Sequence, residues 1–134
     1  RPFSIVAFDP LRRARRAEWD GERFELCALG DAQRPVCSSS LDPIGAGASR
    51  RRVYAETVEA AGRLDSALLE SFHASHAPER GALSPCMHRA DAHTVSFSRL
   101  VVTRAELEFH YSPAAPCARA PRSTTRLRRA TCVG

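Results

Sequence analysis

The chain has 134 residues and a formal net charge of +5, and 43% of its residues are hydrophobic. Because domains commonly contain about 100–150 residues, this length and composition suit one domain with a core of its own. No apolar run approaches the roughly 20 residues that a membrane-spanning helix needs, so we expect no membrane insertion.

The N-terminal part contains short segments with strand-like patterns. Phe3–Phe8 is apolar and rich in strand formers, and Asp-Pro follows it, so we predict a strand there. Residues 11–20 are basic, and we expect one or two helical turns in them. Residues 22–29 alternate between apolar and polar, which predicts a half-buried strand, and residues 34–37 are expected to return beside it as an antiparallel strand.

The middle of the chain predicts a loop followed by a long helix. Serine, glycine, alanine and proline dominate residues 38–49, where we expect the loop. Residues 51–75 carry apolar side chains at steps of three and four, which predicts one amphipathic helix with Ser49 as its N-cap and Pro78 beyond its end. Gly62 lies inside this helix and costs up to about 1 kcal/mol relative to alanine, so it indicates close packing or a weak point.

The C-terminal part predicts a sheet and a tail. Residues 94–111 alternate, which fits two strands joined near residues 102–104 or one long bent strand. Residues 112–134 are basic and punctuated by proline, which indicates an extended tail. We therefore predict an α+β fold, in which one main amphipathic helix packs on a small antiparallel sheet. The domain should cover residues 1–111, and the basic C-terminal tail should cover residues 112–134.

Five widely spaced cysteines are candidates for disulfide bonds in an oxidising compartment. They are Cys27, Cys37, Cys86, Cys117 and Cys132. No two are spaced as CxxC, which argues against a zinc ribbon and a thioredoxin-type pair. The sequence starts with arginine, which suggests either removal of a leader or an artificially trimmed terminus. An odd count leaves one thiol free or bonded to a partner chain. Reduced, buried cysteines are the alternative.

The segment 73–93 holds four of the five histidines. His73 and His76 can share a helix face, and Cys86 and His88 can share one side of an extended segment, so these four are candidate ligands of a tetrahedral zinc ion. Their spacing matches no common zinc module, so we favour no metal and expect no cofactor. The alternatives are histidines that cap a helix beside a polar loop, and a proton switch near pH 6.

All twenty basic residues are arginine. This bias has a functional interpretation, because the guanidinium suits phosphate and carboxylate groups, and a genomic one, because GC-rich coding sequence favours arginine. The clustered arginines are the candidate binding residues for a polyanion such as RNA or heparin. They are Arg12, Arg13, Arg15, Arg16, Arg50, Arg51, Arg52, Arg126, Arg128 and Arg129.

No stretch matches a catalytic motif, so we expect no enzymatic activity. We predict a non-catalytic subunit or ligand, extracellular or surface-associated and stabilised by disulfides. It should bind another protein chain through a sheet edge and the basic tail, and the unpaired cysteine could make that link covalent. One alternative is an arginine-rich subunit of an organellar or viral assembly that contains nucleic acid. Another is a small zinc-binding protein that uses the histidine and cysteine cluster.

Overall fold

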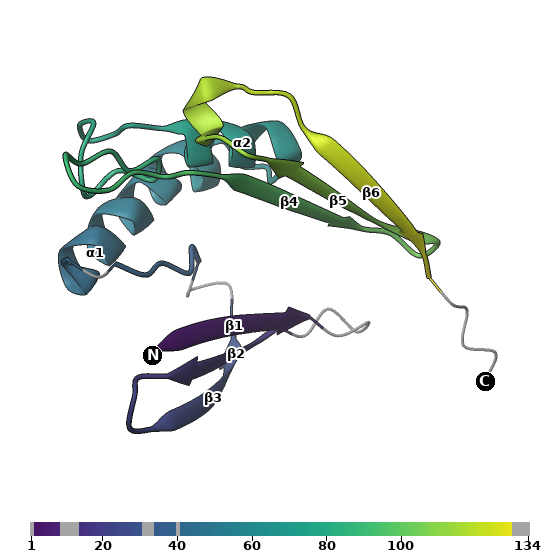
Figure 1. The fold of residues 1–134 in the computed structure, drawn as a ribbon, viewed down its shortest axis with the longest axis horizontal. Helices are drawn as coiled ribbons and strands as arrows, with labels where there is room; N and C mark the ends of the chain where they lie inside the picture. The colour runs from purple at the N-terminus through teal and green to yellow at the C-terminus, as the bar shows by residue number, and fades with distance from the viewer. Residues whose placement is uncertain (1, 9–13, 31–33, 40, 130–134) are drawn as a thin grey trace. The chain divides into compact units, whose positions relative to one another are not determined.

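The computed structural model describes residues 2–8, 14–30, 34–39 and 41–129. These residues cluster into two compact units, divided between Val36 and Cys37. Each unit contains a three-stranded antiparallel sheet, and the helices all belong to the second unit (Figure 1). The fold is therefore α+β, as the sequence predicts. In the described residues, no helix is long and apolar enough to cross a membrane.

The first unit is the sheet β1-β2-β3, formed by Phe3–Phe8, Ala14–Trp19 and Phe24–Leu29. Two of these strands were predicted, but β2 replaces the expected helical turns. Basic side chains do not prevent a strand here, because β2 is central and pairs along its whole length with both neighbours. The expected return strand at residues 34–37 is also wrong, since β3 pairs with β2 and Pro35 has no N–H to donate.

The predicted long helix is two helices, and the first begins earlier than expected. Helix α1 spans Pro43–Tyr54 and continues as a π-helical turn, η2, over Ala55–Glu59. The Asp42 carboxylate accepts a hydrogen bond from the Gly45 N–H at 2.8 Å, and a proline at the first helical position needs no partner for its nitrogen. The expected cap, Ser49, therefore lies inside α1, and part of the predicted loop is helical.

The break between the helices lies at Gly62, which has a φ of +64°. Glycine adopts this left-handed conformation without a steric penalty, which makes it a common residue after the end of a helix. Helix α2 then spans Ser66–Ala74, where the Asp65 carboxylate accepts a hydrogen bond from the Leu68 N–H at 2.8 Å. Of the two sequence interpretations of Gly62, the weak point is confirmed.

The small apolar core lies between these helical segments. Val53, Tyr54, Val58 and Phe72 are buried, and Leu69 packs against them. The rings of Tyr54 and Phe72 meet edge to face, with centroids 5.4 Å apart. These residues come from the predicted apolar stripe, so the stripe forms core as expected, with the two helices folded against each other.

The second sheet has the order β4-β5-β6. Strands β4, Phe97–Val102, and β5, Glu106–Ser112, confirm the first of the two predicted arrangements, two strands in place of one long bent strand. Because Leu100 pairs with Phe109, the odd positions of β4 lie on the opposite face from the odd positions of β5. The apolar series expected on one face is therefore divided between both faces.

The predicted tail contributes structure to this sheet. A 3-10 turn, η3, spans Pro116–Ala118, and β6 spans Ser123–Arg128 and pairs antiparallel with β5. The expected boundary after residue 111 thus falls within β5, and the strand that pairs with β5 lies beyond that boundary. The scarcity of large apolar side chains predicts a tail, yet β6 is stabilised by backbone pairing and cross-strand contacts that need none.

Candidate metal centre

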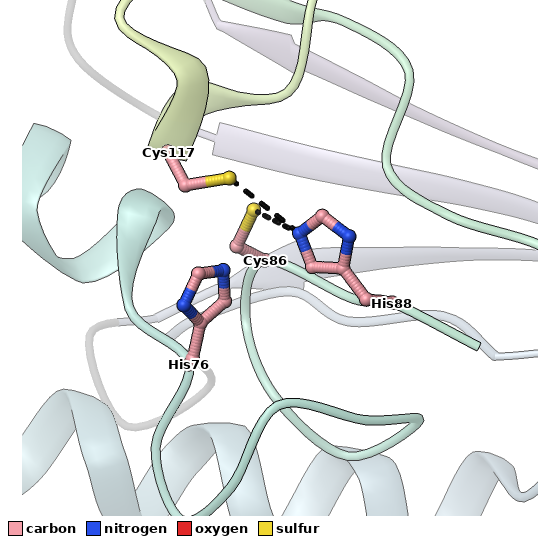
Figure 2. A group of neighbouring side chains, drawn as sticks. All are labelled: His76, Cys86, His88 and Cys117. Carbon is pink, nitrogen blue, oxygen red and sulfur yellow. Dashed lines mark hydrogen bonds between the residues drawn. The ribbon is translucent and has the colours of Figure 1, made fainter.

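Four side chains from three separate segments meet beside the end of α2 (Figure 2). They are His76, Cys86, His88 and Cys117, and their ligand atoms all lie within 4.8 Å of one another. We call this group the His₂Cys₂ cluster. Two imidazoles and two thiols are the donor set that proteins use for zinc, so the cluster can be tested against the geometry of a zinc ion.

The end of α2 positions the first two members of the cluster. The helix ends at Ser75, whose backbone turns to an extended conformation, and His76 follows it directly. The Cys86 N–H then donates to the Ser75 carbonyl at 3.0 Å, which holds Cys86 beside His76. Buried Ser84 supports this connection, because its hydroxyl donates to the Cys86 carbonyl at 2.7 Å.

A tight turn over residues 87–94 positions His88. The Thr94 N–H donates to the Met87 carbonyl at 2.9 Å, and the Met87 N–H donates to the Thr94 hydroxyl at 3.0 Å. His88 and His93 form a bridge within this turn, and their rings stack with centroids 6.4 Å apart. His93 is therefore a neighbour of the cluster and packs against one of its members.

Cys117 reaches the cluster from the η3 turn, which lies between β5 and β6. Its Sγ lies 3.5 Å from Nε2 of His88, and the Sγ of Cys86 lies at the same distance of 3.5 Å from that nitrogen. A tetrahedral zinc ion has Zn–S bonds of about 2.3 Å and Zn–N bonds of about 2.0–2.1 Å, which places sulfur and nitrogen ligands about 3.6 Å apart. Both observed distances match this value.

A buried nitrogen of His76 has no partner. Its Nε2 is shielded from solvent and makes no hydrogen bond within the described residues. Buried polar atoms in folded proteins are almost always satisfied, so this nitrogen is available to a water or a metal ion. A metal ion bound by the four side chains would satisfy it.

The surroundings of the cluster shift the pKa values of His88 and Cys86. Partial burial, followed by the positive charge of Arg80, lowers the pKa of His88, which favours the neutral imidazole that binds metals. Burial is the main cause that raises the pKa of the Cys86 thiol. A thiolate there therefore needs a nearby cation, and a zinc ion deprotonates a coordinating thiol.

The structure brings together three of the four candidate ligands named from the sequence. His73 is the exception, because its ring packs between Phe72 and Phe97, with centroid distances of 5.2 and 5.4 Å. The sequence does not predict Cys117 as a member of the cluster, since it lies 29 residues beyond His88 and only the path of the chain between β5 and β6 brings it back. Its one signal in the sequence is the presence of prolines on both sides, at positions 116 and 121.

Among the described residues, Cys27, Cys86 and Cys117 carry free thiols. Cys132 lies outside the described residues. Burial raises the pKa of Cys37, against the opposing charges of Arg50 and Arg51. The disulfide assignments made from the sequence stay predictions, and the arrangement of Cys86 and Cys117 offers both thiols a second chemistry, metal binding.

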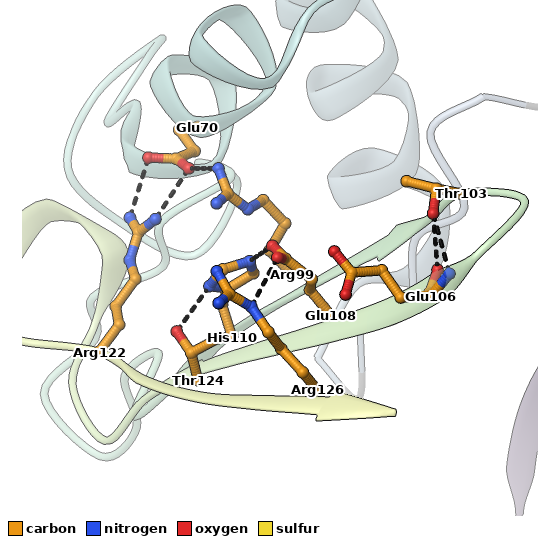
Figure 3. Close-up of polar contacts among 9 residues, drawn as sticks. All are labelled: Glu70, Arg99, Thr103, Glu106, Glu108, His110, Arg122, Thr124 and Arg126. Atoms are coloured by element: carbon orange, nitrogen blue, oxygen red, sulfur yellow. Dashed lines mark hydrogen bonds and ion pairs between the residues drawn. The ribbon is translucent and has the colours of Figure 1, made fainter. Parts of the chain in front are cut away.

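The clustered arginines serve several local roles. Arg16, Arg52 and Arg126 form ion pairs with Glu18, Glu56 and Glu108, at 2.8, 3.9 and 2.8 Å (Figure 3 shows the third). These three charges are partly neutralised.

Two other arginines hold the backbone. Arg50 donates to the carbonyls of Ser38, Ala82 and Ser84 at 3.0, 3.3 and 3.2 Å. The Arg129 guanidinium donates to the Thr103 carbonyl at 2.6 Å. Arg15 lies in β2, Arg51 in α1 and Arg128 in β6, while Arg12 and Arg13 lie outside the described residues.

Comparisons of the chain with protein-family models, with curated proteins and with solved structures find no match. The His₂Cys₂ cluster and its surroundings are therefore the features of the chain that bear on its function.

Proposed function

We propose that the protein is a small zinc-binding protein, in which the His₂Cys₂ cluster holds one structural Zn²⁺. The observation that supports this most is the convergence of four zinc-type donor atoms from three segments at separations suited to a tetrahedral ion. The unpartnered nitrogen of His76 supports it independently.

The proposed role of the ion is structural. Four protein ligands complete a tetrahedral shell and leave no position for a water or substrate, as in structural zinc sites. The ion would join the end of α2, the connector before β4 and the η3 turn. The apolar core found among the described residues is small for a unit of this length, so a metal that links three segments would supply stability that the core lacks.

The test begins with elemental analysis of the full chain, purified without added zinc. We expect about one zinc per chain, and loss of most of it in His76→Ala and Cys117→Ala. The matched controls are His73→Phe and Cys37→Ser, which change the same residue types outside the cluster and should keep their zinc. Wild-type protein that is folded and free of zinc, and that takes up none when it is added, would overturn the proposal.

A second measurement covers ligand variants that fail to fold. Cobalt(II) replaces zinc in such sites and reports its ligands through visible and thiolate charge-transfer absorption. Cys117→His keeps four donors while removing one thiolate, so its cobalt complex should form with weaker charge-transfer absorption than that of the wild type. An unchanged spectrum would exclude Cys117 as a ligand.

We also propose that the zinc-stabilised unit binds another protein chain, and one observation favours this over binding to nucleic acid. The face of the second sheet that carries Leu100, Val102, Phe109, Tyr111 and Leu127 exposes between 38% and 59% of each of these side chains. A contiguous exposed apolar face is typical of a protein interface. The ion-paired arginines described above weaken the case for a polyanion.

Salt dependence separates these two partners. A protein partner held on the apolar face should copurify in equimolar amount, resist high salt, and be lost in the doubly substituted Leu100→Thr, Leu127→Thr protein. Binding to RNA or heparin that falls steeply with salt and survives this double substitution would instead favour the polyanion.

A further inference from the structure

A cavity of about 590 Å³ lies next to the His₂Cys₂ cluster, between α2, the start of β4 and the segment that follows β5. Its volume falls in the range of small-molecule sites, about 300–1,000 Å³. The α2 wall is formed by Ala67, Ser71 and Ala74, whose small side chains leave room above the helix. The cavity therefore has the size of a ligand site and shares none of its lining residues with the cluster.

The remaining wall combines apolar residues with two arginines. The Phe97 ring lies at the start of β4, and Pro116 and Ala120 come from the segment around η3. The Arg122 guanidinium covers the Phe97 ring, with its central carbon 5.1 Å from the ring centroid. This wall offers a hydrophobic surface beside a fixed positive charge.

Glu70 on α2 holds the guanidinium group of Arg122 in place (Figure 3). Its two carboxylate oxygens accept hydrogen bonds from Arg122 at 2.8 and 2.9 Å, and one of them also accepts from Arg99 at 2.7 Å. The hydrogen bond from Arg122 is the main cause that holds the pKa of Glu70 below its ordinary value. Two of the five N–H donors of Arg122 are used by this pair, and three remain.

Arg119 adds a second positive charge to the cavity wall. It ends the η3 turn in the left-handed conformation, with a φ of 51°, which costs a residue other than glycine roughly 1 kcal/mol. Among the described residues, its guanidinium has no ion-pair or hydrogen-bond partner. In the lining of the cavity, the two guanidinium groups of Arg119 and Arg122 thus outnumber the single carboxylate of Glu70.

We propose that this cavity binds a small organic anion, which carries a carboxylate or phosphate group on an apolar body. The anionic group would be bound by Arg119 and the remaining donors of Arg122, because guanidinium groups match the geometry of both oxyanions. The apolar body would pack against Phe97 and Pro116. This inference goes beyond the proposed zinc site and stands on the cavity itself, so either can fail without the other.

The test is a titration of the full chain, labelled with ¹⁵N, with phenyl phosphate, benzoate, inorganic phosphate and acetate. We expect saturable shifts of the amide signals of Ser71, Phe97 and Ala120 with phenyl phosphate or benzoate, and the stronger of the two identifies the anionic group. Inorganic phosphate and acetate should bind at least about tenfold more weakly, because they lack an apolar body.

A matched pair of variants locates the site. Arg119→Gln should weaken binding by about tenfold or more, while Arg104→Gln, in the exposed connection between β4 and β5, should leave it unchanged. Zinc content is measured in each sample, so loss of the metal is distinguished from loss of the anion site. Three results would overturn the proposal: no saturable shifts, equal affinity for phenyl phosphate and inorganic phosphate, or unchanged binding in Arg119→Gln.

Discussion

The Sγ of Cys117 lies 3.5 Å from Nε2 of His88, although 29 residues separate the two along the chain. The intervening residues include β4 and β5, so this contact closes a loop around most of the second sheet. A bond that closes so long a loop restricts the unfolded chain strongly. If a metal ion joins these residues, it should stabilise the whole unit as well as the turn that carries Cys117.

Arg80 favours the neutral form of His88, but it should also place the proton of that imidazole on the nitrogen that a metal would need. The Arg80 guanidinium lies 3.3 Å from Nδ1 of His88 and can only donate, so it favours the tautomer with the proton on Nε2, the nitrogen that faces the thiols. Metal binding through Nε2 requires the proton on Nδ1. We therefore expect Arg80→Gln, whose amide oxygen can accept from that N–H, to raise zinc affinity by up to about tenfold.

Competition with a chelating dye measures this change. Arg89→Gln removes the same charge from the neighbouring turn, where Arg89 pairs with Asp91 at 3.0 Å, and it should not raise the affinity. A gain in both variants would mean that net charge, not the tautomer of His88, controls zinc binding.

Glu70 should make folding sensitive to acid. Its pKa is lowered in the folded protein from an ordinary value of 4.5, so its contribution to stability is complete above that value and is lost as the pH falls through the folded pKa. We expect Glu70→Gln to reduce the free energy of unfolding by about 1 kcal/mol at pH 7, and by progressively less below pH 4.5. Urea denaturation from pH 7 to pH 3 measures this, with exposed Glu79→Gln as the control, and a difference independent of pH would contradict the assignment.

Arg50 should contribute more to the free energy of unfolding than its neighbour Arg51 in the same cluster. It donates to three backbone carbonyls that belong to the segments before α1 and before Cys86. Arg50→Gln should lower the free energy of unfolding by about 2–3 kcal/mol, because these acceptors lose charged donors. Arg51→Gln should change it by less than about 0.5 kcal/mol in the same chemical denaturation experiment. Equal effects of both substitutions would show that Arg50 acts only through its charge.

A side chain at Gly62, the break between the helices, should destabilise the protein. With a φ of +64°, its replacement by alanine is strained even though no atom lies within 4 Å of the added Cβ. We expect Gly62→Ala to destabilise the protein by about 1 kcal/mol. Gly81→Ala also meets open space but has no positive φ, so it should be neutral or slightly stabilising. Thermal unfolding compares the two, and a neutral Gly62→Ala would show that the helices can join without this conformation.

Zinc and the proposed anion should influence each other's binding. Cys117 lies in the η3 turn, and the next residues, Ala118 and Arg119, lead directly into the cavity wall. Removal of zinc should free this segment and weaken phenyl phosphate binding by about fivefold, a coupling of about 1 kcal/mol. The titration is repeated with and without a chelator. Equal affinities would show that the cavity wall holds its shape without the metal.

Local sequence patterns determined much of the secondary structure. The strands β1, β3, β4 and β5 follow from alternation and strand-forming residues, and the apolar stripe of the helical region does supply the core. These features depend on neighbours a few residues apart, which a sequence displays directly. The start of α1 also has a local signal, Asp42 followed by Pro43, but the pattern of the following residues predicted a later cap.

Only the tertiary structure decided the features that join distant segments. Pairing on both sides makes a strand of the basic residues in β2, and pairing with β5 turns part of the expected tail into β6. The sequence predicted that His76, Cys86 and His88 lie near one another. It did not indicate that Cys117, and not His73, is the fourth member of the cluster. The identity of the fourth member depends on the direction in which α2 ends and on the return of the chain after β5. Both are set by packing and strand pairing between residues that are far apart in sequence, which no local pattern records.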